Sequence, residues 1–196
     1  GIIWDGVIVL ENDRIKSLGK AKDLEIPEGA EVLDAHGLYV GPGFVDIHVH
    51  GGNGFYFEKS PEDAAEFFLK NGTTTIVPTL YFDLSKQGFL DAIATIRHAK
   101  DTSKYGKSIE GLYMEGPYMN PKYGAMADLN KWKGDICPDQ YEEVVDAAGD
   151  FVKVWAIAPE REGIVSFLQY AKKKNPKVVF SVGHSEATPE QITALK

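Results

Sequence analysis

The sequence predicts an α/β protein built around a parallel β-sheet, because apolar segments and helical segments alternate from residue 41 onward. Five short segments have the near-continuous apolar character of strands buried on both faces of such a sheet. The predicted strands span residues 43–47, 73–77, 108–114, 151–157 and 178–182. The predicted helices span residues 61–71, 85–100, 138–148 and 161–175.

The first forty residues differ from the rest and predict a small antiparallel β-unit. Turn-forming residues at 5–6, 11–13 and 27–29 separate its short β-prone pieces. These pieces span residues 2–3, 7–10, 14–18, 31–34 and 38–40. We therefore predict two domains, a small β-unit over residues 1–40 and a parallel-sheet domain over residues 41–196.

Each predicted helix has its own start signal. The clearest is Ser60, a good N-cap, followed by Pro61 in the first turn and by acidic Glu62 and Asp63 at the positive end of the helix. One more helix begins at residue 188, with barely two turns before the sequence ends at Lys196. A sheet that stops there has an unclosed edge, so we expect the sequence to be part of a longer barrel or sheet.

Composition narrows the classes of partner and location. The 21 basic and 29 acidic residues give a formal charge of −8, which argues against nucleic acid or an anionic membrane as a partner. Cys137 is the single cysteine, so no internal disulfide forms, as in a reducing cytoplasm. The sequence has no apolar run of about 18 residues and no visible signal peptide. These features predict a soluble cytoplasmic protein.

A pair of histidines suggests a metal site. His48 and His50 end a β-prone run and are separated by one residue, so their side chains would lie on the same face of a strand. Glycine-rich segments flank them on both sides. Because neutral imidazole is the commonest metal ligand, we interpret the pair as ligands of a metal ion.

Further candidate ligands follow the other predicted strands. Glu115 follows the third strand, His184 the fifth, and Glu160 the fourth, although the acidic residues 160–162 are also typical of a helix start. The carboxyl ends of parallel strands meet at one rim, where α/β proteins place their sites. Three imidazoles with one or two carboxylates form the ligand set of a hydrolytic zinc or iron site.

Three further residues are not assigned as ligands of this site. His36 lies in a predicted turn and His98 on the exposed part of a helix, so both are predicted to be solvated. Asp46 is a candidate for holding the tautomer of an imidazole, because it would face the same side as His48.

Residues 34–50, from Asp-Ala-His-Gly-Leu to Phe-Val-Asp-Ile-His-Val-His, resemble the start of the amidohydrolase superfamily. Within it, residues 113–122, 158–160 and 183–185 are similar to the N-acetylglucosamine-6-phosphate deacetylase family. The resemblance runs through essentially the whole sequence, as roughly the N-terminal half of such an enzyme. It implies about five βα units of a TIM (β/α)8 barrel, preceded by part of a small β-sandwich.

The resemblance also implies a function and roles for several residues. Glu115 and His184 would hold one divalent ion, zinc or iron(II), and His48 and His50 a second beside it. The substrate would be an amino sugar phosphate, N-acetylglucosamine 6-phosphate, contacted by residues that include Gly116, Asn120, Lys131 and Lys133. The family's general acid/base is an aspartate late in the barrel, expected beyond Lys196, so this chain by itself is expected to be inactive. A homo-oligomer is expected for the full-length parent.

One departure from the family leaves alternatives open. Met126 stands where the family has a substrate-binding histidine, and a thioether cannot replace its hydrogen bond or charge. Lys131, Trp132 and Lys133 follow and could rebuild the pocket for a related sugar. One alternative is a member of the same superfamily that hydrolyses another N-acyl or cyclic-amide substrate. Another is a half-barrel that binds metal without turnover.

Overall fold

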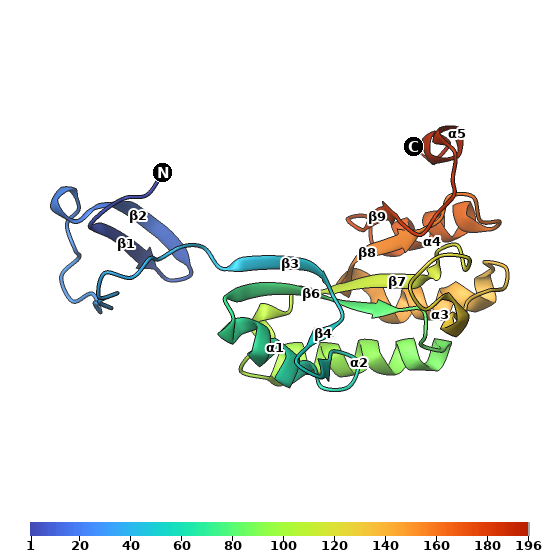
Figure 1. The fold of residues 1–196 in the computed structure, drawn as a ribbon, viewed down its shortest axis with the longest axis horizontal. Helices are drawn as coiled ribbons and strands as arrows, with labels where there is room; N and C mark the ends of the chain where they lie inside the picture. Colours follow the sequence, from blue (N-terminus) through green and yellow to red (C-terminus); the bar gives the residue numbers. More distant parts are fainter. Residues whose placement is uncertain (196) are drawn as a thin grey trace. The chain divides into compact units, whose positions relative to one another are not determined.

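The computed structural model describes residues 1–195, and the chain divides into two compact units. The first unit is Gly1–Pro42, and the second begins at Gly43. Lys196, the last residue of the predicted parallel-sheet domain, lies outside the described residues. Each unit has its own sheet, so each is described by itself (Figure 1).

The first unit contains one antiparallel hairpin. Strand β1 (Gly6–Glu11) pairs with β2 (Arg14–Lys20), and a short 3₁₀ helix, η1 (Ala21–Asp23), follows. The hairpin confirms the predicted strands over residues 7–10 and 14–18. The predicted strands over residues 2–3, 31–34 and 38–40 are wrong: these segments have no ladder partner among the described residues, and a lone extended segment is not stable.

The second unit is a five-stranded parallel half-barrel, which confirms the predicted fold class. Its strand order, β3-β6-β7-β8-β9, follows the chain, and every neighbouring pair is parallel. The strands are β3 (Phe44–Val49), β6 (Thr73–Tyr81), β7 (Leu112–Tyr118), β8 (Val152–Ile157) and β9 (Val179–Val182). A small antiparallel pair, β4 (Gly51–Gly52) and β5 (Phe55–Tyr56), follows β3.

Helices connect consecutive strands and pack side by side along the sheet (Figure 1). They are α1 (Pro61–Lys70), α2 (Lys86–Thr102), α3 (Pro138–Ala148) and α4 (Ile164–Lys174). The short α5 (Pro189–Thr193) follows β9. Three 3₁₀ turns join these elements: η2 (Gly106–Ser108), η3 (Ala127–Leu129) and η4 (Gly149–Phe151).

Two helix starts differ from their predictions. Ser60 occupies the N-cap position of α1, but its side chain makes no capping hydrogen bond; its hydroxyl lies 3.4 Å from the carbonyl of Tyr56. Helix α4 begins at Ile164 instead of residue 161, because Gly163 takes a left-handed conformation (φ +82°) before the helix. A β-carbon at Gly163 would lie 2.0 Å from the carbonyl oxygen of Ile136, so only glycine fits there.

The core lies between the sheet and its helices. Phe167 of α4 is fully buried and packs on the ring of Tyr118, with ring centroids 3.9 Å apart. Trp155 of β8 and Tyr141 of α3 complete this aromatic group, at 5.3 and 5.8 Å from the Phe167 ring. The cluster fixes α3 and α4 on β7 and β8, and so fixes the strands whose ends carry the polar residues.

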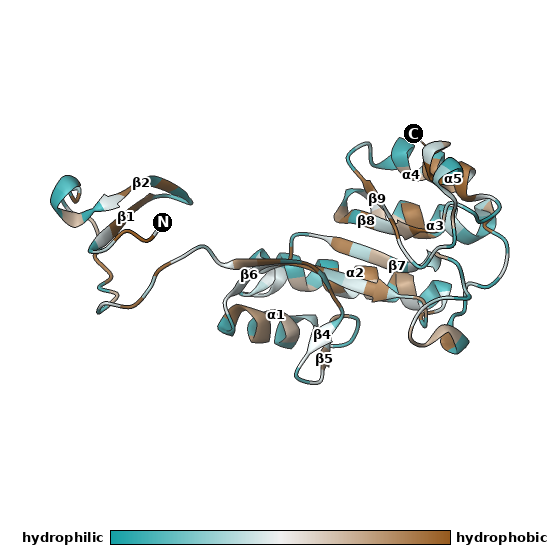
Figure 2. Ribbon diagram, turned by 45° about the horizontal axis from the view of Figure 1, so that its top comes forward, coloured by the Kyte–Doolittle hydropathy of each residue, from teal (hydrophilic) through white to brown (hydrophobic). Residues whose placement is uncertain are grey.

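Burial varies across the sheet. Every residue of the central strand β7 is buried, whereas β3 and β9 at the edges contain exposed and half-buried residues and no buried ones. Phe44 and Val179 are 71% and 57% exposed, and Figure 2 shows these apolar edges. The prediction that all five strands are buried on both faces is therefore wrong for β3 and β9, because each has a neighbouring strand on one side only.

Among the described residues, no helix is both long enough and apolar enough to cross a membrane.

Truncating the Phe167 side chain should destabilise the second unit strongly. We expect Phe167→Ala to lower the free energy of unfolding by about 3–5 kcal/mol, since a fully buried aromatic ring leaves a cavity. Urea denaturation followed by tryptophan fluorescence would measure the change. Val165→Ala, on the same helix but 51% exposed, is the matched control and should stay within about 0.5 kcal/mol of the wild type. Equal losses in both variants would contradict this view of the core.

Candidate metal centre

Four side chains that lie far apart in the sequence meet at one end of the sheet. Glu115 is at the centre: its Oε2 lies 3.0 Å from Nε2 of His48 and 3.1 Å from Nε2 of His50. Its other oxygen, Oε1, lies 2.9 Å from Nε2 of His184. The structure thus brings together all four residues that the sequence predicts as metal ligands.

The parallel sheet explains this meeting. His48 belongs to β3 and His50 follows it, Glu115 lies within β7, and His184 comes just after β9. The prediction that Glu115 follows its strand is wrong, since β7 continues to Tyr118. The difference matters, because a strand fixes the direction of a carboxylate more firmly than a loop does.

Neighbouring groups orient the two histidines at the end of β3. The Nδ1 of His50 lies 3.1 Å from the carbonyl oxygen of Thr79, which leaves its Nε2 facing Glu115. The Thr79 hydroxyl also accepts the backbone N–H of Val49 at 3.0 Å. The ring of His48 packs edge-on against Tyr113, with centroids 4.5 Å apart. A carbonyl at Nδ1 is the usual way to fix which nitrogen of a histidine faces a metal.

Glycine is required directly after Glu115. Gly116 has φ +155°, and a β-carbon there would lie 2.6 Å from the backbone nitrogen of Phe82. The end of β6 therefore approaches β7 more closely than any side chain at position 116 would allow. This close approach places Tyr81 beside Glu115 in the register of the two strands.

The buried carboxylate is electrostatically tuned. Burial by itself would raise the pKa of Glu115, but contact with His50 and the charges of the three imidazoles outweigh it, so the pKa is lowered. The pKa of His50 is raised, chiefly by contact with Glu115, against the opposing effect of burial. Glu115 is thus held as a carboxylate.

The chemistry of the donor set fits a divalent ion. Among the described residues, Glu115 Oε2 is buried without a hydrogen-bond partner of acceptable geometry, although two imidazole nitrogens lie near it. His48, His50 and Glu115 offer ligand atoms that all lie within 4.8 Å of one another. Nitrogen and oxygen ligand atoms that lie close together without satisfying one another's hydrogen-bonding capacity are typical of a metal site.

Other polar residues near these strands make different contacts. The side chain of Asp46 accepts the backbone N–H of His48 at 3.1 Å, so the prediction that it holds an imidazole is wrong. Glu160 binds Ser185, Glu186 and Asn120 instead of joining the ligand cluster. His36 is exposed and near Asp34, and His98 is not part of the cluster.

The four residues predicted to contact substrate have different surroundings. Gly116 and Asn120 are buried near the cluster, and the Asn120 amide binds Glu160. Lys131 and Lys133 are exposed on the loop that precedes α3. The ammonium of Lys133 lies 3.4 Å from the carbonyl oxygen of Asp128, so it is held by the loop itself.

The predicted general acid/base has no counterpart in the described site. Its aspartate is expected beyond Lys196, so it is not a residue of this sequence, and Lys196 itself lies outside the described residues. The expectation of that aspartate therefore stays a prediction.

A cavity of about 290 Å³ opens beside His50. Its lining includes two carboxylates and one lysine: Glu58, Asp83 and Lys59. Met126 also lines it, and its sulfur accepts a hydrogen bond from the Tyr81 hydroxyl at 3.1 Å. Sequence reasoning missed Tyr81, for which the only signal was its place at the end of an apolar strand.

Comparison with known proteins gives a consistent relationship. No model of a known protein family matches the chain. It is 24% identical over 196 residues to N-acetylglucosamine-6-phosphate deacetylase of Vibrio furnissii, covering 97% of this chain and 48% of the relative. It is 27% identical over 157 residues to N-acetylgalactosamine-6-phosphate deacetylase of Escherichia coli O157:H7, covering 78% and 41%.

Solved structures agree with the sequence comparison. Two structures of N-acetyl-D-glucosamine-6-phosphate deacetylase from Mycobacterium smegmatis each match with a TM-score of 0.70, at 28% and 27% identity. They cover 97% of this chain and 52% and 48% of theirs. The second is an aspartate-to-alanine variant in complex with N-acetyl-D-glucosamine-6-phosphate. The chain spans about half the length of these relatives and is a homologue of the N-acetylglucosamine-6-phosphate deacetylases, corresponding to their N-terminal portion.

Proposed function

We propose that this chain carries the metal-binding part of an amide hydrolase that removes acetate from N-acetylglucosamine 6-phosphate to give glucosamine 6-phosphate. The observation that carries the proposal is the meeting of three imidazoles around both oxygens of one buried carboxylate. The homology supports the substrate class, since a homologous structure contains N-acetyl-D-glucosamine-6-phosphate.

The geometry supports separate roles for the two oxygens of Glu115. Oε1 faces His184, and Oε2 faces His48 and His50, so one carboxylate can bridge two positions. We assign Glu115 and His184 to one divalent ion, zinc or iron(II), and His48 and His50 to a second. A bound ion would polarise the acetamide carbonyl and lower the pKa of a water molecule.

The chain's own residues orient these ligands and exclude water from the carboxylate. Thr79 directs the His50 ring, and burial within β7 keeps solvent from Glu115. The amide hydrolysis also needs a proton acceptor, which the family takes from an aspartate late in the barrel. We expect this chain by itself to bind metal without turnover.

The substrate-facing residues are part of the same proposal. Gly116 and Asn120 lie closest to the ligands, and Lys131 and Lys133 are the cations available to a phosphate. The cavity beside His50 is a poor phosphate site, because Glu58 and Asp83 outnumber Lys59 there.

A second candidate follows from this cavity. Its acidic lining and the Tyr81–Met126 contact favour a neutral or cationic group in that position. The related activity would be hydrolysis of another N-acyl or cyclic-amide substrate by the same metal centre.

Acetate release separates these candidates. Acetate would be measured with N-acetylglucosamine 6-phosphate, its unphosphorylated form and the galactosamine isomer. Zinc or iron(II) would be supplied, and the assay would compare this chain with a longer protein that contains it. Preference for the phosphorylated glucosamine would support the proposed function. No acetate from any sugar with the longer protein, with metal demonstrably bound, would contradict it and favour the second candidate.

Removing the charge of Glu115 should weaken metal binding. We expect Glu115→Gln to reduce zinc affinity more than about tenfold, since even partners that only orient ligands are worth about 10–100-fold. Isothermal titration calorimetry would measure it. Glu110→Gln is the matched control, because Glu110 is exposed just before the same strand and pairs with Lys153. Unchanged affinity in Glu115→Gln would refute the ligand role.

The metal-free site should make stability depend on pH. The lowered pKa of Glu115 gives stability above its ordinary value of 4.5 that is lost as pH falls through the folded pKa. The raised pKa of His50 gives stability below its ordinary value of 6.5 that is lost as pH rises through the folded pKa.

We therefore expect the difference in free energy of unfolding between wild type and Glu115→Gln to be largest between pH 4.5 and 6.5. Urea denaturation with chelator present, repeated across this range and on both sides of it, would check the expectation. A difference that keeps growing toward pH 8 would be inconsistent with it.

A further inference from the structure

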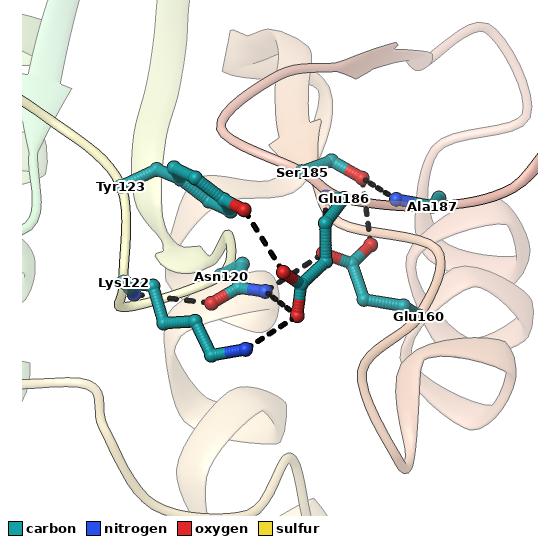
Figure 3. A network of polar contacts seen from close by, with 7 residues as sticks. All are labelled: Asn120, Lys122, Tyr123, Glu160, Ser185, Glu186 and Ala187. Carbon is teal, nitrogen blue, oxygen red and sulfur yellow. Dashed lines mark hydrogen bonds and ion pairs between the residues drawn. The ribbon is translucent and has the colours of Figure 1, made fainter.

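Glu160 is the centre of a polar network beside the proposed metal site. Figure 3 shows its carboxylate between two loops, one after β7 and one after β9. Oε2 accepts the Ser185 hydroxyl at 2.6 Å. Oε1 accepts the backbone N–H of Glu186 at 2.8 Å and the Asn120 amide at 2.9 Å. All three partners donate, and a carboxylate is an acceptor at both oxygens.

These bonds hold the two residues that follow His184. The backbone of His184 is left-handed, with φ +50°, which is uncommon for a residue other than glycine and persists where the surroundings enforce it. Its carbonyl oxygen accepts the backbone N–H of Asn120 at 3.0 Å. Glu160 therefore holds residues 185 and 186, while Asn120, itself bonded to Glu160, holds the carbonyl of His184.

The neighbouring Arg161 fixes the loop that follows β7. Its guanidinium donates to the carbonyls of Pro117, Met119 and Trp132 at 3.2, 2.9 and 3.3 Å, and also to that of Gly134. Five-donor guanidinium groups suit such a cluster of acceptors. The loop that carries Asn120 is thus anchored to the end of β8 independently of Glu160.

Exposed side chains also join the loop after β7 to the loop after β9. Glu186 binds the ammonium of Lys122 at 2.6 Å and the hydroxyl of Tyr123 at 2.9 Å (Figure 3). These side chains are exposed, so they contribute less than the contacts of Glu160. Glu160 therefore adds a side-chain connection from the end of β8 to the two residues after His184, while the backbone N–H of Gly183, just before His184, donates to the carbonyl oxygen of Ile157 at 3.1 Å.

We propose that Glu160 is a positioning residue that directs the His184 imidazole toward Oε1 of Glu115. It acts through residues 184–186 and leaves His48 and His50 untouched, because those two are held by β3 and Thr79. The importance of this role for metal binding rests on the proposed function, whereas the positioning of the ring can be tested without metal.

The test compares Glu160→Gln with Glu162→Gln. Glutamine keeps the size of the Glu160 side chain but places an amide NH₂ group opposite at least one of the three hydrogen-bond donors. Glu162 is an exposed neighbour and serves as the matched control. The ¹⁵N resonances of the histidine side chains would be recorded on the metal-free chain. We expect Glu160→Gln to shift the signal of His184 and to leave those of His48 and His50 in place.

One other variant and one metal titration complete the experiment. Ser185→Ala removes one of the same bonds, so its effect on His184 should not add to that of Glu160→Gln. Cobalt(II) titration followed by visible absorption should show about tenfold weaker binding in Glu160→Gln.

The outcomes are separable. Equal shifts of all three histidines, or none, together with a lower unfolding midpoint, would show a merely structural role and overturn the proposal. A wild-type chain that binds no cobalt would contradict the proposed function, while the metal-free spectra still decide the role of Glu160.

Discussion

The buried carboxylate of Glu115 and the three imidazoles around it form the interaction on which the rest of the site depends. A carboxylate removed from water is costly unless charged or hydrogen-bonding groups compensate for it. Here the compensation comes from β3 and from the loop after β9, while the carboxylate comes from β7. The site therefore depends on the parallel order β3-β6-β7-β8-β9, which brings these segments to the same end of the sheet.

The strands and the loops contribute different degrees of order to this centre. Glu115 lies within β7 and His48 within β3, where Tyr113 packs on its ring, and Thr79 holds His50 just after β3. His184 lies beyond its strand in a left-handed conformation, so its direction depends on side chains from elsewhere. Glu160 contacts Ser185 and Glu186 after β9 and Asn120 after β7, and the adjacent Arg161 holds the carbonyls of the loop after β7.

The surroundings of the metal ligands bear on the choice of substrate. The homology and the ligand set are the support for the proposed hydrolysis of an acetamide, and neither depends on which other groups the substrate carries. The cavity beside His50 differs in character, because carboxylates and a methionine line it. In the proposed function, separate sets of residues would therefore carry the chemistry of the reaction and the recognition of the substrate.

The sequence by itself determined the α/β class, the central strands and the four side chains that meet at the site. Local patterns suffice there: a strand's period of two puts His48 and His50 on one face, and parallel strands align their ends. It misplaced the end of β7, gave Asp46 the wrong partner, left the role of Glu160 open, and predicted strands near residues 31–40 that do not form. Only the tertiary structure decided these, because a hydrogen-bond partner, an edge strand and a left-handed turn depend on residues that lie far away along the chain.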